Sequence, residues 1–106
     1  MIVTVFRARL RPEHALEYSA LAGDIAAQAD EIYKRIGEIL AAAGCSYSDV
    51  VSTRDFITTT EGYAKTATVR RKYFSDPFPA ATGVIVAGLL RPGALIEIEA
   101  VAALPR

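Results

Sequence analysis

An unbroken apolar run near the C-terminus, Val84–Leu90, limits most strongly how this chain can fold. We expect strands at 82–90 and 94–104, on either side of the turn Arg91–Ala94. A strand with one solvent-exposed face alternates apolar and polar side chains, whereas a continuous apolar run is typical of burial on both faces. With only two main helices, which we place on one face of the sheet, we expect the cover of the other face to come from another copy of the chain.

The remaining elements follow from periodicity and from helix-ending residues. A β-branched segment, 1–10, predicts a strand that stops before Pro12. Apolar residues then recur at three- and four-residue steps as far as position 43, which indicates helix. Gly23 interrupts this pattern, so the segment is either two helices, at 12–22 and 24–43, or one bent helix.

A second strand at 49–59 and a second main helix at 61–74 complete the order β-α-β-α-β-β. This order predicts a single α+β domain over residues 1–106, with the helices on one face of the sheet.

Composition argues against several classes of function. Twelve cationic and twelve anionic side chains give a net charge of zero, which disfavours nucleic acid as a partner. We interpret the densest basic cluster, Arg70-Arg71-Lys72, as a solvated helix face. One cysteine and one histidine disfavour the common metal sites, and we expect neither a metal nor a cofactor. Without a secretory signal or a long apolar segment, we expect a cytoplasmic protein that does not enter a membrane.

The C-terminal strands also carry a family resemblance. Pro79-Ala80-Ala81-Thr82 and Glu97-Ile98-Glu99-Ala100 resemble the Pro-Ala-Arg-Thr/Ser and Glu-Ile-Glu-Ala strands of the YjgF-type, or Rid (reactive intermediate deaminase), family. The resemblance extends over 23–104. It implies a chorismate-mutase-like fold, here without the first family strand, in homotrimers whose sheets pack together and whose clefts between subunits bind small molecules.

The N-terminal segment departs from this family. Residues 1–22 lack its Gly-Pro-Tyr and Ser-Gly-Gln elements and instead resemble the opening strand and helix of antibiotic-biosynthesis-monooxygenase domains. Those domains are dimeric α+β barrels, and some act without a cofactor. A monooxygenase-like dimer is therefore an alternative, although it rests on the first 22 residues only.

The resemblance also implies the site residues. Rid enzymes hydrolyse imines and enamines of 2-oxo acids, with an arginine that binds the substrate carboxylate and a glutamate that positions water. Glu97 matches the glutamate, so we expect it to be catalytic, but Ala81 stands where the arginine belongs. Thr82 and Gly83 follow it and remain candidates for binding a ligand oxygen.

Another arginine can in principle replace the missing one. Arg54 is the first candidate, although it can equally pair with Asp55 or with a carboxylate of a neighbour; Arg7, Arg9 and Arg91 are further candidates.

Three functional hypotheses remain open. The first is a Rid-like trimer that binds a small metabolite, with deaminase activity reduced or lost because a fork-shaped guanidinium is missing. The loss favours a neutral or differently oriented ligand. The second is a hydrolase that acts through Glu97 on a different imine or enamine. The third is the monooxygenase-like dimer.

Overall fold

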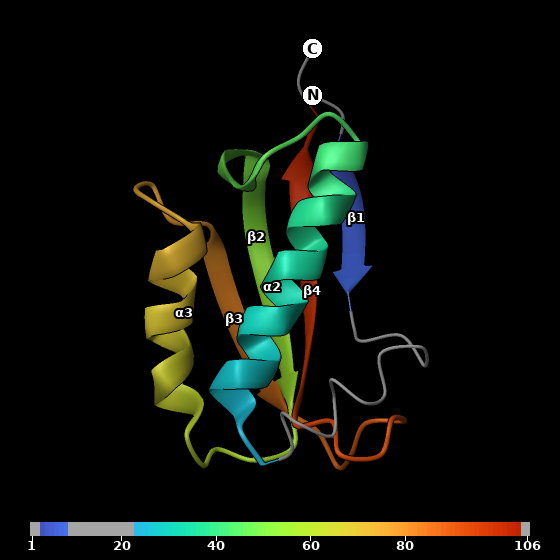
Figure 1. The fold of residues 1–106 in the computed structure, drawn as a ribbon, viewed down its shortest axis with the longest axis vertical. Coiled ribbons are helices and arrows are strands. Elements are labelled where there is room, and N and C mark those ends of the chain that lie inside the picture. Colours follow the sequence, from blue (N-terminus) through green and yellow to red (C-terminus); the bar gives the residue numbers. More distant parts are fainter. Residues whose placement is uncertain (1–2, 9–22, 105–106) are drawn as a thin grey trace.

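The computed structural model describes residues 3–8 and 23–104, which form a four-stranded sheet with helices on one face (Figure 1). The elements are β1 (Val3–Ala8), α2 (Ile25–Ala42), β2 (Val50–Ile57), α3 (Thr66–Tyr73), β3 (Ala80–Ile85) and β4 (Ile96–Ala103), with the short 3-10 helices η2 (Tyr47–Asp49) and η3 (Tyr63–Lys65). The strand order is β1-β4-β2-β3. β4 runs antiparallel to both of its neighbours, and β2 and β3 are parallel. The predicted α+β architecture is confirmed.

Helix α2 forms as its sequence pattern predicts. The Asp24 side chain accepts a hydrogen bond from the Ala27 amide at 2.9 Å and so caps the first turn. Gly44, just beyond the other end, has a φ of +77°, a left-handed conformation that glycine adopts at little cost. The apolar stripe of α2 is buried against the sheet and consists of Ile25, Ala29, Ile32, Ile36 and Leu40. The alternative first helix, 12–22, lies outside the described residues.

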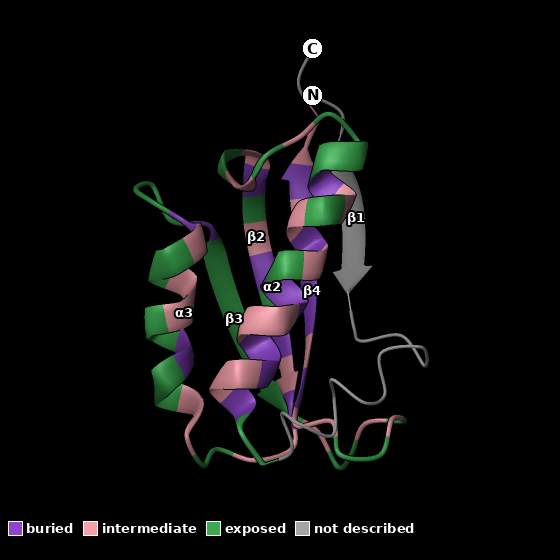
Figure 2. Ribbon diagram, viewed as in Figure 1, coloured by how far each residue is buried: buried purple, intermediate pink, exposed green. Residues whose placement is uncertain are grey.

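Side-chain alternation along β4 separates the two faces of the sheet. Ile96 and Ile98, with Ala100 and Ala102 after them, are buried beneath the helices. Glu97 and Glu99 therefore lie on the opposite face, which we call the open face, as the sequence predicts. Figure 2 shows β4 almost entirely buried or half-buried, whereas β3 is exposed from end to end.

The apolar run that was expected to form one long strand does not do so. β3 ends at Ile85, and after one more hydrogen bond, from the Val86 amide to the Ile57 carbonyl at 2.8 Å, the chain leaves the sheet. The physical reason is that β2, its neighbour, ends at Ile57, so later residues have no ladder partner. Nor is β4 adjacent to β3, because β2 lies between these two strands. The prediction of a strand at 82–90 is wrong for residues beyond 85. β3 itself is exposed within this chain, so its burial by another copy stays a prediction.

The run nevertheless leaves apolar surface at this edge of the sheet. Val84 is 38% and Ile85 68% exposed on β3, and Leu90, in the loop that follows, is 94% exposed. β3 is the last strand of the sheet, and an unpaired, exposed edge of this kind favours association with another chain.

Helix α3 is shorter than the predicted 61–74. It begins at Thr66 and follows η3, because Gly62 adopts a left-handed φ of +73° that interrupts a continuous helix. Among the described helices, none has both the length and the hydropathy that crossing a membrane requires.

Candidate functional site

The predicted site residues lie on two different faces of the sheet. Residues that oppose each other in a ladder point to the same face. Ala81 opposes Thr53 and Gly83 opposes Asp55, so Ala81 and Gly83 belong to the face that the helices cover. Glu97 opposes Phe56 on the open face. A single chain therefore does not bring Ala81 and Glu97 together.

The open face holds the predicted catalytic glutamate. Glu97 is half-buried and lines a hollow of about 210 Å³. The hollow has apolar walls from Phe56, Val86 and Leu89, and Gly88 and Glu99 complete its lining. A carboxylate beside apolar walls can position a water molecule and exchange a proton with a small uncharged group.

Arg54 and Thr82 also belong to the open face, since they oppose each other in the β2–β3 ladder. The guanidinium Nη1 of Arg54 lies 3.8 Å from Oε1 of Glu99, its partner in the β2–β4 ladder. The Arg54 side chain is 55% exposed, so this pair contributes little to stability. Arg54 thus pairs across the sheet and not with the adjacent Asp55.

A polar cluster lies on the other face, between α3 and strands β2 and β3. The hydroxyl of Tyr63 donates to Asp55 Oδ2 at 2.7 Å, and Oδ1 of the same carboxylate is buried with no hydrogen-bond partner among the described residues. Burial raises the pKa of Asp55, an effect that the Tyr63 hydrogen bond and the charge of Arg70 partly offset. Burial, with the hydrogen bond to Asp55, also raises the pKa of Tyr63.

Arg70 is the central cation of this cluster, which corrects the interpretation of Arg70-Arg71-Lys72 as a solvated face. Arg71 and Lys72 are exposed as predicted, but Arg70 is half-buried and turns toward the sheet. The signal was present in the sequence, because Arg70 stands four residues from both Thr66 and Phe74. Both of these residues are buried, and positions four apart share a helix face.

The turn before β4 is held by a buried glutamine. The Ala94 amide donates to the Arg91 carbonyl at 3.1 Å and Gly93 has a φ of +82°, so the predicted turn is confirmed. Gln28 of α2, fully buried, donates to the Gly93 carbonyl at 3.0 Å and accepts from the Leu95 amide at 2.8 Å. These two bonds fix the start of β4 and hence the position of Glu97.

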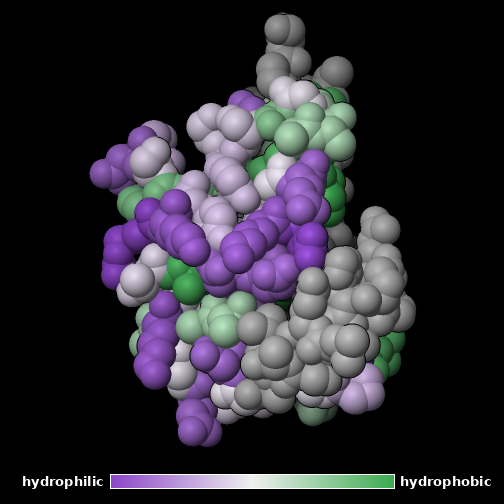
Figure 3. Space-filling model, in the orientation of Figure 1, coloured by the Kyte–Doolittle hydropathy of each residue, from purple (hydrophilic) through white to green (hydrophobic). Residues whose placement is uncertain are grey.

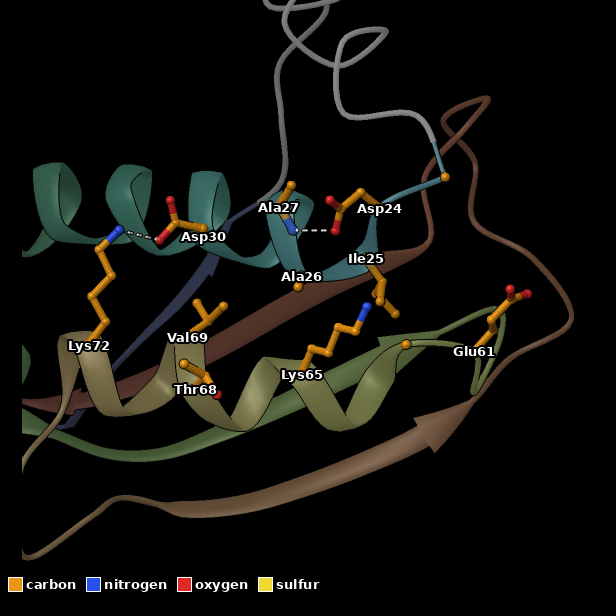
Figure 4. A pocket seen from close by; sticks show the side chains of 12 residues that line it. Asp24, Ile25, Ala26, Ala27, Asp30, Glu61, Lys65, Thr68, Val69 and Lys72 are labelled. Carbon is orange, nitrogen blue, oxygen red and sulfur yellow. Dashed lines mark hydrogen bonds and ion pairs between the residues drawn. The ribbon is translucent and has the colours of Figure 1, made fainter.

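A larger hollow, of about 810 Å³, lies between the N-terminal half of α2 and α3 (Figure 4). Among the charged side chains that line it, Lys72 and Asp30 form an ion pair at 2.9 Å. Figure 3 shows that hydrophilic side chains cover much of the outer surface of α2 and α3, the side that faces away from the sheet. None of the predicted site residues lines this hollow. In the part of the chain that is described, no three histidine, cysteine, aspartate or glutamate side chains are grouped so as to hold a metal ion.

Comparison with known proteins gives consistent matches. A family model described as endoribonuclease L-PSP matches residues 12–104. The 2-iminobutanoate/2-iminopropanoate deaminase of Homo sapiens is 38% identical over 82 residues, which are 77% of this chain and 59% of that protein. Protein DfrA of Myxococcus xanthus is 36% identical over 80 residues, which are 76% of this chain and 60% of that protein. The chain thus spans about three fifths of the length of these curated relatives.

Solved structures agree with the sequence matches. A member of the YjgF/YER057c/UK114 family from Mycobacterium tuberculosis superposes with a TM-score of 0.76 and 31% identity, over 94% of this chain and 77% of that one. RidA from Psychrobacter superposes with a TM-score of 0.70 and 34% identity, over 76% of this chain and 64% of that one. The family model includes residues 12–22, part of the segment behind the monooxygenase alternative. The side chains of 1–22 lie outside the described residues.

Proposed function

The chain belongs to the YjgF/Rid family, and on this premise we propose that it forms a RidA-like homotrimer that binds a small metabolite in clefts between subunits. The proposal includes a reduced or lost 2-imino-acid deaminase activity. The proposal concerns the homotrimer as a whole, and its support comes in part from relatives that are longer than this chain.

The observation that carries this proposal is the separation of the two family positions. Ala81 and Glu97 belong to opposite faces of the same sheet, so a site that uses both must combine one position from each of two copies. The exposed edge strand β3, with Ile85 68% exposed, offers the apolar surface on which a second copy can pack.

The reduced activity follows from the chemistry of the reaction. Water adds to the carbon of the C=N bond, the C–N bond then breaks, and the products are a 2-oxo acid and ammonia. Glu97 can position the water and transfer its proton to nitrogen. The methyl group of Ala81 cannot form the two parallel hydrogen bonds by which a guanidinium orients the substrate carboxylate, so the reacting carbon is less well placed.

A second candidate function is hydrolysis of a different imine or enamine through Glu97. The hollow beside Glu97 favours it, because its walls are apolar and its volume of about 210 Å³ suits a small uncharged group. Such a substrate would not need the missing arginine.

The test is ammonia release from imines of the 2-aminoacrylate type, measured for wild type, Ala81→Arg and Glu97→Gln. We expect slow wild-type turnover, a gain of tenfold or more in Ala81→Arg, and loss of that gain when Glu97→Gln is added. Glu61→Gln, at an exposed glutamate outside the strands, is the matched control. Rapid wild-type turnover would refute the reduced activity. Glu97-dependent hydrolysis of a neutral imine, without a gain in Ala81→Arg, would favour the second candidate.

Light scattering tests the assembly. We expect a mass of about three chains for wild type and a smaller mass for Ile85→Lys, which places a charge on the exposed edge of β3. Ala41→Lys, exposed on α2, is the control and should keep the wild-type mass. A monomeric or dimeric wild type would contradict the trimer.

A further inference from the structure

The guanidinium of Arg70 is fixed in position by three hydrogen bonds. Nη1 donates to Thr53 Oγ1 at 2.5 Å and to the Tyr33 hydroxyl at 3.1 Å, and Nη2 donates to the Pro79 carbonyl at 3.3 Å. Its central carbon also lies 5.3 Å from the centre of the Phe74 ring, within the range of a cation–π contact. A cation held from several sides loses little further entropy when it binds a ligand.

These partners place the guanidinium next to the position where the family arginine is missing. Thr53, which accepts from Arg70, opposes Ala81 directly in the β2–β3 ladder and shares its face. Pro79, the second anchor on this side, precedes Ala81 by two residues. Ala81 itself is exposed, and its methyl group leaves open the space that a longer side chain would fill.

Arg70 also retains binding capacity. A guanidinium has five N–H donors, and three of them are used by Tyr33, Thr53 and Pro79. Within the described residues, no carboxylate lies within ion-pair distance of Arg70, whereas Arg54 faces Glu99 at 3.8 Å. Asp55 lowers the net charge of the cluster, but its hydrogen bond comes from Tyr63. A half-buried cation with spare donors and no ion pair favours an anionic ligand.

We propose that Arg70, supplied by α3, binds the carboxylate of the ligand in place of the arginine that is absent at position 81. This inference rests on the proposed function and names its ligand class as small 2-oxo or 2-imino acids. The sequence predicts a neutral or differently oriented ligand, and Arg70 favours the second alternative, an acid bound in a different position. Because the guanidinium reaches the site from the helix and not from β3, the bound acid is displaced relative to Glu97 of the neighbouring copy. Binding is then retained while turnover is slow.

The test is calorimetric titration with 2-oxobutanoate, which has the carboxylate but no imine to hydrolyse, and with butanone, which lacks the carboxylate. We expect wild type to bind 2-oxobutanoate and not butanone. Arg70→Gln should weaken 2-oxobutanoate binding at least tenfold. Arg71→Gln, on the exposed side of the same helix turn, should bind as wild type does.

A rescue experiment separates ligand binding from a structural role. Adding Ala81→Arg to Arg70→Gln returns a guanidinium to the same face of β3 and should recover most of the lost affinity. If Arg70→Gln does not fold, Arg70→Lys replaces it, since lysine keeps the charge but not the planar fork. Arg70→Lys is then expected to bind 2-oxobutanoate at least several-fold more weakly than wild type.

The outcomes separate this inference from the proposed function. Undiminished binding in Arg70→Gln or Arg70→Lys, or no binding of 2-oxobutanoate to a trimeric wild type, would overturn the role of Arg70 and leave the trimer proposal intact. Rapid imine hydrolysis by wild type would refute the reduced activity, and the titrations would still decide whether Arg70 binds the acid.

Discussion

Tyr63→Phe removes the hydroxyl that donates to Asp55 Oδ2 at 2.7 Å. Asp55 is only 5% exposed, and its other oxygen already has no partner among the described residues. The variant therefore leaves a buried carboxylate without that hydrogen bond. Hydrogen bonds to charged groups contribute about 1.5–3 kcal/mol, and a domain of about this size loses about 4 °C in melting temperature per kcal/mol. We expect a decrease of about 6–12 °C at neutral pH.

The effect has a definite pH dependence. Burial raises the folded-state pKa of Asp55 above its ordinary value of 3.8. The stability linked to this group is therefore fully present below 3.8 and is lost as the pH rises through the folded-state pKa. Removing the Tyr63 hydroxyl raises that pKa further, since it withdraws a hydrogen bond to the charged form. The cost of Tyr63→Phe should grow as the pH rises from about 4 to 7.

Urea denaturation at pH values of about 4 and about 7 measures how much Tyr63→Phe lowers the free energy of unfolding. The protein concentration is kept fixed, because association adds to apparent stability. Tyr47→Phe is the matched control: its hydroxyl donates to the neutral Tyr33 carbonyl at 2.7 Å. That loss should cost about 0.5–1.5 kcal/mol at either pH. The reasoning is refuted if Tyr63→Phe costs no more than Tyr47→Phe at neutral pH, or if its cost is the same at both pH values.

Three further predictions concern stability. Gly83→Ala places a Cβ 2.9 Å from the Tyr63 hydroxyl and should destabilise the fold by about 1–3 kcal/mol, whereas Gly88→Ala, with nothing within 4 Å, should be neutral in the same denaturation assay. Gln28→Leu removes two hydrogen bonds from the turn before β4, to the Gly93 carbonyl and from the Leu95 amide, and should cost about 1–3 kcal/mol by thermal melting. Burial raises the pKa of Asp30, but hydrogen bonds from α3 outweigh this effect, so the folded-state pKa is lowered. The stability that the Asp30 carboxylate contributes is therefore present above 3.8 and is lost as the pH falls through the folded-state pKa. Asp30→Asn should therefore cost up to about 1 kcal/mol at neutral pH and nothing in strong acid; a constant difference would contradict this.

Much of the fold could be predicted from local pattern. The Asp24 cap, the apolar stripe of α2 and the alternation of Ile96 and Ile98 with Glu97 each depend on residues close together in the chain. The prediction was wrong where the length of a strand depended on a partner strand that is distant in the sequence. β3 ends at Ile85 because β2 ends at Ile57, and no property of the run Val84–Leu90 shows where its neighbour stops.

The candidate site divides in the same way. The sequence by itself determined the family pattern, the retained Glu97 and the absence of arginine at position 81, because these are identities of residues at fixed spacing. Only the tertiary structure decided that Ala81 and Glu97 lie on opposite faces of the sheet and that Arg70 reaches the strand beside Ala81. Strand register and the packing of α3 bring together groups that are distant in sequence, so local spacing alone does not determine their arrangement.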